Sequence, residues 1–292
     1  MKRKDYWFKI GALMLLCVGL YAFQELKNAP VTLTLQDALA KKMVSCKYSS
    51  TGMYSGESVN ISITNLSNSE LNITIPRGSV FKPSEVADQD LIVVQQQAIA
   101  LNAKANLKQV VDGFCMEATD HAPTANNGMK LSKTTNAKLT ELTAFLDGKK
   151  YDKSSIQSAV WAVSNNYSFS SIDGDSPRGK ALRTFLSKLT QREDPWYETK
   201  QNYAVTPSRV IQISPVEVNG RIQFESEAGM KIHCVVKDGS GDVKNVMQEL
   251  EYPSKGKSTY HFKLIVKGWS NGNYKVEVMN GTTVLQTFPF TV

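Results

Sequence analysis

The sequence predicts an α+β fold that is mainly β, with an N-terminal β-sandwich or barrel, an inserted or appended three-helix bundle, and a second β-sandwich. Two changes of hydrophobic period support this. Apolar residues alternate up to about residue 117, recur at helical spacing over 118–195, and alternate again from about 205. A length of 292 residues is enough for two or three domains.

The first residues have the pattern of an export signal. Basic residues at positions 2–4 precede an uncharged run at 10–23. This run is shorter than the roughly 20 residues of a membrane-spanning helix and fits the apolar core of a signal peptide. We therefore expect 1–23 to be a signal peptide or, alternatively, an uncleaved membrane anchor. The remaining chain would be extracytoplasmic, either secreted or on the cell surface, with a periplasmic or membrane-anchored location as the alternative.

The N-terminal β-region begins after a short helix. Residues 35–43 have apolar side chains at helical spacing. The segments 59–63 and 71–75 then alternate between apolar and polar residues, and the turn-rich segment 65–69 separates them. This pattern predicts a β-hairpin with one buried face.

Further short strands complete this β-region. Continuous apolar runs at 91–94 and 98–101 are typical of buried strands, and the segment 106–116 predicts a last strand that carries Cys115. We therefore expect residues 44–117 to form a β-sandwich or barrel.

The middle of the chain predicts three amphipathic helices. The first covers the apolar positions of 139–146, and the second runs over 156–164 with Ser154 or Ser155 as its N-cap. The third begins near Pro177, a residue favoured in the first turn. Each helix has one apolar face, so together they would form a small bundle packed on the β-region.

The C-terminal part predicts a separate β-sandwich. Alternating strands at 205–292 are separated by turns rich in glycine, asparagine, aspartate and serine, and the segment 192–201 would be the linker. The stretch 268–276 resembles a strand pair common in immunoglobulin-like and secretion-signal domains of Bacteroidetes exoproteins. The resemblance implies an immunoglobulin-like domain that serves as a spacer or as a sorting signal.

Composition and charge exclude several function classes. The net charge of +7 is scattered, without the basic stripe of a nucleic-acid-binding face. The three histidines offer no zinc pattern, and we expect neither a metal nor a cofactor. Beyond the N-terminal segment the chain has Cys46, Cys115 and Cys234, an odd number that cannot all pair within an exported chain. At least one cysteine is free or consumed by other chemistry.

Two short motifs contain the candidate site residues. Cys115 stands between the apolar residues Phe114 and Met116. Gln157 is the second residue of the other motif, Ile156-Gln157-Ser158-Ala159-Val160-Trp161, at the expected start of a helix. The pair of motifs resembles the cysteine and glutamine motifs of bacterial surface thioester domains, and the resemblance covers roughly residues 44–190.

This resemblance implies an internal thioester between the Cys115 sulfur and the Gln157 carbonyl carbon. Cys115 would be the acyl-carrying thiol and Gln157 the acyl donor, and a lysine amine on a target would be acylated once. We expect free N–H groups at the helix N-terminus to stabilise the oxyanion. Apolar neighbours would shield the bond from water, namely Phe114, Met116, Ile156, Val160 and Trp161.

The sequence thus predicts an exported, adhesion-type protein that is not an enzyme beyond a single-turnover acyl transfer. Its thioester-domain-like head would span 44–195, and its partner would be an unknown protein or surface ligand. Contact with a membrane would come only through an uncleaved N-terminal anchor. The alternative is a non-covalent structural or interaction module of the bacterial envelope. A cysteine hydrolase that pairs Cys115 with His121 is a third hypothesis.

Overall fold

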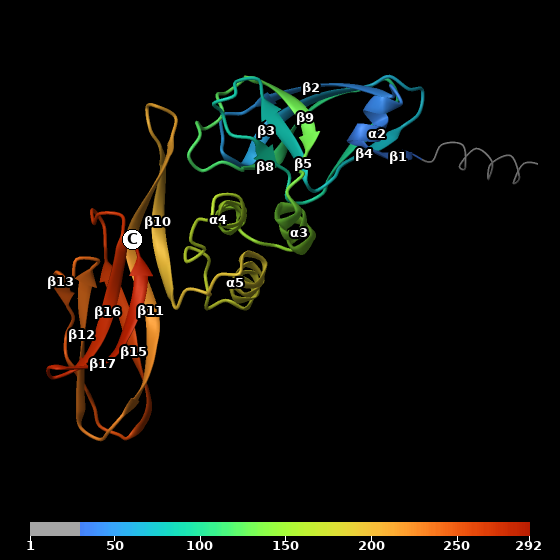
Figure 1. Ribbon diagram of the computed structural model, residues 1–292. Helices are drawn as coiled ribbons and strands as arrows, with labels where there is room; N and C mark the ends of the chain where they lie inside the picture. The colour runs from blue at the N-terminus through green and yellow to red at the C-terminus, as the bar shows by residue number, and fades with distance from the viewer. Residues whose placement is uncertain (1–29) are drawn as a thin grey trace, which may run out of the picture.

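The computed structural model describes residues 30–292 and confirms a mainly β, α+β fold (Figure 1). Within this range the chain has four helices, and strands make up most of the other regular structure. The signal peptide or anchor expected at 1–23 lies outside the described residues. Over 30–292, none of the helices has the length and apolar character needed to cross a membrane.

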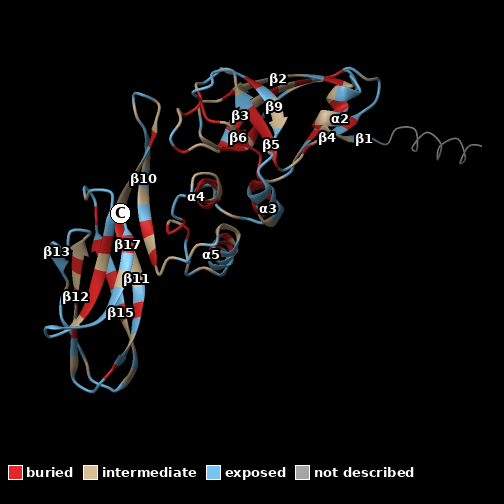
Figure 2. Ribbon diagram, in the orientation of Figure 1, coloured by how far each residue is buried: buried red, intermediate tan, exposed pale blue. Residues whose placement is uncertain are grey.

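Six strands close into a barrel in the N-terminal β-region. In order around the barrel they are β2 (Val44–Ser50), β3 (Ser55–Asn65), β8 (Asn106–Cys115), β6 (Leu91–Ile92), β5 (Ser79–Pro83) and β9 (Gly128–Lys133). Alternation along β3 sends Val59, Ile61 and Ile63 into the interior, where each is at most 1% exposed. Figure 2 shows buried residues along these strands in red.

A second, smaller sheet lies beside helix α2 (Leu35–Ala40). Its strand order is β1 (Val31–Thr34), β4 (Leu71–Ile75) and β7 (Gln97–Leu101). Because β4 pairs with β1 and β7 and not with β3, the predicted hairpin of 59–63 with 71–75 is wrong. The side-chain amide of Asn65 donates to the carbonyls of Ser69 and Asn102, and the turn it fixes leads the chain out of the barrel.

Three helices follow the barrel: α3 (Ala137–Leu146), α4 (Lys153–Ser164) and α5 (Pro177–Thr190). Their N-caps are Asn136, Asp152 and Ser176, whose side chains each accept a backbone N–H of the first turn. The predicted cap of the middle helix, Ser154 or Ser155, is wrong, because the Asp152 carboxylate accepts the Ser155 N–H at 2.7 Å. Helix α4 therefore starts at Lys153, earlier than expected.

The helices share a core of their own. Leu142, Val160 and Leu186, one from each helix, are fully buried in it. Helix α4 contacts both of the other helices and also β8 and β3. It therefore packs the helical core against two strands of the barrel.

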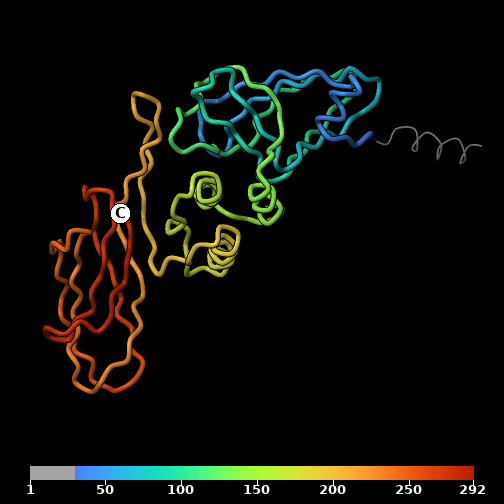
Figure 3. The backbone as a smooth tube through the Cα atoms, in the orientation of Figure 1, coloured from blue at the N-terminus to red at the C-terminus, as the bar shows by residue number. Residues whose placement is uncertain are grey.

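The C-terminal strands form two sheets. One has the order β10 (Tyr197–Val205), β11 (Ile211–Ser226) and β15 (Gly256–Ile265). The other has the order β13 (Val243–Val246), β12 (Met230–Asp238), β16 (Asn273–Asn280) and β17 (Thr283–Thr291), with β14 (Leu250–Tyr252) also paired to β12. The segment 192–201, expected to be a linker, is partly strand, since β10 begins at Tyr197. Figure 3 traces the chain from α5 into this strand.

The hairpin of β10 and β11 extends beyond its sheet and docks on the barrel (Figure 1). Ile211 is buried within the barrel core, and Tyr203 and Ile213 pack against that core. At the hairpin tip, the Arg209 guanidinium lies 2.8 Å from Asp88 Oδ1, and the Asp88 side chain is fully buried. This attraction is between charges rather than through an aligned hydrogen bond, since Oδ1 accepts none. The C-terminal strands thus complete a surface of the barrel.

Candidate functional site

Cys115 is the last residue of β8 and is fully buried. Its backbone N–H donates to the Tyr54 carbonyl at 2.9 Å, and the strand pairs Cys115 with Leu91 of β6. Strand alternation places Phe114 in the helical core and Cys115 in the barrel core. The end of β8 therefore lies at the boundary between the barrel core and the helical core.

Gln157 lies on α4, one turn beyond the helix start, and is 3% exposed. Its carboxamide makes two hydrogen bonds with the backbone of one residue. Oε1 accepts the Cys115 N–H at 3.1 Å, and Nε2 donates to the Cys115 carbonyl at 2.8 Å. The structure therefore brings together the cysteine and the glutamine of the two motifs and fixes which way the carboxamide faces.

The backbone donor to the Gln157 side-chain carbonyl does not come from the helix N-terminus. Since Gln157 follows the first turn of α4, the free N–H groups of the helix end do not face its carbonyl. The donor to Gln157 Oε1 is instead the backbone N–H of Cys115 itself, which Oε1 shares with the Tyr54 carbonyl. A backbone donor already aimed at the carbonyl oxygen is the arrangement that stabilises a developing oxyanion.

Burial sets the electrostatics around the thiol. It raises the pKa of Cys115 well above its usual value, and the nearby carboxylates of Glu117 and Asp88 raise it further. Burial also raises the pKa of Glu117 to about 7, partly offset by the hydrogen bond that its carboxylate accepts from the Asp90 N–H at 2.8 Å. Cys115 is therefore held as a neutral thiol at neutral pH.

The predicted shielding residues surround the pair from two sides. Four of them belong to or pack against the helical core, namely Phe114, Met116, Ile156 and Val160. Trp161 is 2% exposed and packs in the barrel core instead. All except the partly buried Met116 are buried.

Two aromatic residues near the site were missed by the sequence analysis. The rings of Tyr54 and Tyr203 lie 6.2 and 6.3 Å from that of Trp161. Tyr54 precedes β3, whereas Tyr203 comes from the docked hairpin. Both contacts link distant parts of the chain, so no local pattern could have revealed them.

The other candidates of the sequence analysis lie elsewhere. His121 Nδ1 is 3.4 Å from Arg209 Nη2, and the residue forms a bridge with Val210 of the hairpin. Its structural role is at the docked tip, and no hydrogen bond joins it to Cys115 within 30–292. Over the same residues, no group of three or more histidine, cysteine, aspartate or glutamate side chains could hold a metal.

A second glutamine reproduces the two-point pairing without a cysteine. Gln97 Oε1 accepts the Asp112 N–H at 3.0 Å, and its Nε2 donates to the Asp112 carbonyl at 2.9 Å. Asp112 lies on the same strand as Cys115. What distinguishes Gln157 is therefore its burial and the cysteine that it pairs with, and Gln97 is a natural control for experiments on the site.

Comparisons with known proteins identify no family for the chain. No family model matches it, and no curated protein matches it. Among solved structures, a β-glucosidase from Kluyveromyces marxianus in complex with glucose is similar at 8% identity and a TM-score of 0.22, over 80% of this chain and 45% of that one. DesR, a β-glucosidase from Streptomyces venezuelae in complex with D-glucose, is similar at 7% identity and a TM-score of 0.20, over 85% and 47%. The chain thus spans less than half of either protein, and these scores carry no argument about fold or activity.

Proposed function

We propose that this is an exported, adhesion-type protein of the cell surface or the secreted fraction, whose head forms a thioester between Cys115 and Gln157. The head comprises residues 44–195, a β-sandwich or barrel with a three-helix bundle. Residues 205–292 form an immunoglobulin-like domain that holds the head away from its attachment point. The observation that carries the proposal is the pair of hydrogen bonds that holds the Gln157 carboxamide on Cys115.

Formation of the bond requires only these two residues. The Cys115 sulfur attacks the Gln157 side-chain carbonyl carbon, a C–S bond forms, and the C–N bond breaks. The amide nitrogen leaves as ammonia and takes the thiol proton with it. During the attack the negative charge develops on Oε1, which already accepts the Cys115 N–H. The two hydrogen bonds hold the carboxamide against the Cys115 backbone, so the attack would be intramolecular and would replace a bimolecular encounter.

The buried surroundings of Cys115 favour an uncharged thioester over a charged thiolate. Desolvation raises the pKa of the Cys115 thiol because it disfavours the charged form, whereas a thioester carries no charge. The same effect makes the sulfur a poor leaving group, which slows hydrolysis. A stored thioester would therefore last until a nucleophile is held against it.

The discharge step would be a single acyl transfer. A lysine amine of the target attacks the Gln157 acyl carbon, an amide bond forms, and the sulfur leaves and regains a proton as the free Cys115 thiol. Because the linkage to the target is an amide on Gln157, the protein does not turn over. This matches an adhesive role rather than an enzymatic one.

Intact mass of the purified protein tests the proposal. A thioester lowers the mass by about 17 Da through the loss of ammonia, and methylamine then adds about 31 Da. Cys115→Ala and Gln157→Glu should abolish both changes. The matched controls Cys234→Ala, at another buried cysteine, and Gln97→Glu, at the other paired glutamine, should retain them. An unmodified mass with an alkylatable Cys115 would leave a non-covalent envelope module as the function.

A further inference from the structure

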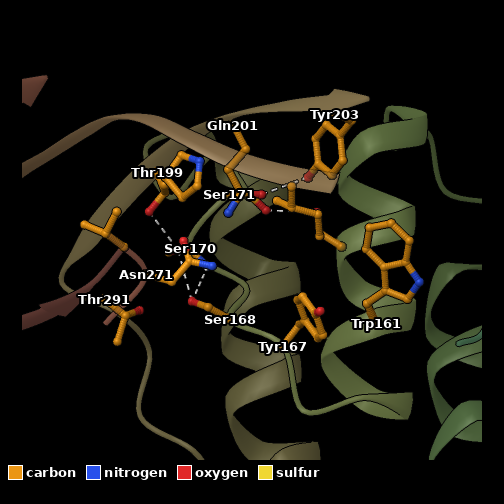
Figure 4. Close-up of a pocket in the computed structure, with 14 residues that line it drawn as sticks. Trp161, Tyr167, Ser168, Ser170, Ser171, Thr199, Gln201, Tyr203, Asn271 and Thr291 are labelled. Atoms are coloured by element: carbon orange, nitrogen blue, oxygen red, sulfur yellow. Dashed lines mark hydrogen bonds between the residues drawn. The ribbon is translucent and has the colours of Figure 1, made fainter. Parts of the chain in front are cut away.

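A cavity of about 170 Å³ lies between the helices and the C-terminal strands (Figure 4). Ser158 and Trp161 of α4 line one side, and Gln201 of β10 lines another. Asn271, which precedes β16, and Thr291, the last residue of β17, complete it. The cavity is therefore built jointly by the helices and by the C-terminal strands, for which the sequence predicted only a spacer or sorting role.

The lining combines apolar surface with uncharged polar side chains. No lysine, arginine, histidine, aspartate or glutamate side chain is among the residues that line the cavity. No charged side chain would therefore pair with a charged ligand. The polar part of the lining consists of hydroxyl and carboxamide groups, which both donate and accept hydrogen bonds.

The hydroxyl groups are held in place by one another. Ser170 Oγ lies 2.9 Å from Thr199 Oγ1 and accepts from Ser168 Oγ at 3.0 Å. Ser158 Oγ lies 2.9 Å from Ser171 Oγ. Each hydroxyl has one donor and two acceptor positions, so these pairs leave acceptor capacity unused. The groups are thus positioned in advance for a ligand that offers hydroxyl donors.

Two carboxamides face the cavity with free groups. The Tyr203 hydroxyl donates to Gln201 Oε1 at 2.9 Å, which orients that side chain, whereas Gln201 Nε2 makes no hydrogen bond within 30–292. The Asn271 side chain is exposed and makes none within the same residues. These groups add directed donors and acceptors to the hydroxyls.

Aromatic rings supply the apolar part of the lining. Tyr203, Tyr167 and Trp161 all line the cavity, and the rings of Trp161 and Tyr167 lie 6.2 Å apart. Tyr167 is 37% exposed and can pack its face against the C–H groups of a ligand, whereas Trp161 is only 2% exposed. A cavity of about 150 Å³ holds one benzene-sized molecule, so this one takes no more than one six-membered ring.

From these features we propose that the cavity binds one neutral sugar unit of a glycan. A pyranose ring is uncharged, carries several hydroxyl groups at its rim and presents C–H groups on its faces. A purely apolar ligand would leave Gln201 Nε2 and the spare acceptor positions of the hydroxyls unpaired, which disfavours such a ligand. The binding itself does not require the thioester.

The cavity also lies next to the candidate thioester. Ser158 follows Gln157 in α4, and Trp161, one turn further on, packs against Tyr54, whose carbonyl accepts the Cys115 N–H. A bound glycan would thus deliver its carrier to the site of acyl transfer. This second part rests on the proposed function.

Binding of D-glucose, D-galactose, D-mannose and N-acetyl-D-glucosamine tests the proposal. Binding is measured by saturation-transfer-difference NMR on the full chain carrying Cys115→Ala. This variant cannot form the thioester. We expect at least one sugar to bind, and Gln201→Ala to weaken it about fivefold or more. The matched control Gln212→Ala, on the exposed face of the same hairpin, should bind as well as the parent protein.

Two outcomes would overturn the proposal. One is that none of the four sugars binds, or that binding survives the double variant Gln201→Ala, Asn271→Ala. The other is that inorganic phosphate or Nα-acetyl-lysine methylamide competes with the sugar for the cavity. Circular dichroism of each variant shows that the fold is kept. Because Cys115 is absent from all these proteins, the result is independent of the mass measurement that tests the thioester.

Discussion

Two hydrogen bonds join the carboxamide of Gln157 to the backbone of Cys115, although the residues are 42 positions apart in the chain. The contact ties helix α4 to the last residue of a barrel strand. It satisfies a buried carbonyl and, in the proposed reaction, directs the carboxamide for attack. Its structural and chemical contributions can be measured separately.

Gln157→Ala in a Cys115→Ala background should lower the free energy of unfolding by about 2–4 kcal/mol, because a buried carbonyl loses its partner and a cavity remains. Urea denaturation measures this without any thioester. Gln97→Ala removes the same pairing at a more exposed side chain and should cost about 1–2 kcal/mol. Equal losses of unfolding free energy for the two variants would show that the burial of Gln157 does not contribute to stability.

Glu117 should make the protein less stable as the pH rises. Its pKa is about 7 in the folded state against 4.5 in the unfolded chain, so between these values the folded protein holds more protons. The free energy of unfolding contributed by Glu117 therefore falls from pH 4.5 to pH 7 and is constant above. Because the side chain is partly exposed, we expect a total of about 1–2 kcal/mol.

Glu117→Gln removes this dependence while its side-chain oxygen can still accept the Asp90 N–H. The variant should match the parent near pH 4.5 and exceed its stability at pH 8. Urea midpoints at pH 4.5, 6 and 8 measure the difference. A gain that is the same at all three values would contradict burial as the cause.

The docked hairpin should depend on the ion pair of Arg209 with Asp88. Arg209→Ala leaves a fully buried carboxylate without its cation and should cost about 3–5 kcal/mol. Adding Asp88→Asn should recover part of this loss. The control is Arg221→Ala, since the pair of Arg221 with Asp175 is exposed on both sides and should contribute no more than about 1 kcal/mol. Thermal unfolding of the three variants compares them directly, and similar losses for both arginines would rule out burial of Asp88 as the source.

Gly179 is required in α5 for steric reasons. A Cβ at this position would lie 1.7 Å from the Asp173 carbonyl oxygen, so backbone must move. Gly179→Ala should therefore cost about 2–3 kcal/mol or more in denaturant unfolding. Gly272→Ala meets nothing within 4 Å and should change stability by less than about 0.5 kcal/mol. A mild effect at Gly179 would mean that the 173–176 turn shifts easily.

Local pattern predicted the elements of the site but not their partners. Alternation identified the strand that ends at Cys115, and helical spacing identified the helix that carries Gln157. Alternation tells which face of a strand is buried and says nothing of its neighbour, which is why β3 and β4 were paired wrongly. Tyr203 reaches the site only through the docked hairpin, a contact that no local pattern encodes.

The start of α4 shows a second limit. Asp152, Ser154 and Ser155 are all good caps, and the sequence does not rank them without geometry. The structure selects Asp152, whose carboxylate accepts both the backbone N–H and the hydroxyl of Ser155 at 2.7 Å. This shift places Gln157 beyond the first turn, so the backbone donor to its Oε1 is a strand N–H and not one at the helix end.

Ile211 belongs to a C-terminal strand and is buried in the barrel core. Heating that detaches the hairpin of β10 and β11 from the barrel should therefore expose the barrel core beside Tyr203 and admit water toward Cys115. We therefore expect the two halves of the molecule to unfold together, and a chain cut after residue 195 to lack part of the barrel interior. An intact thioester would report on this coupling, since its hydrolysis should accelerate when the distant sheet loosens.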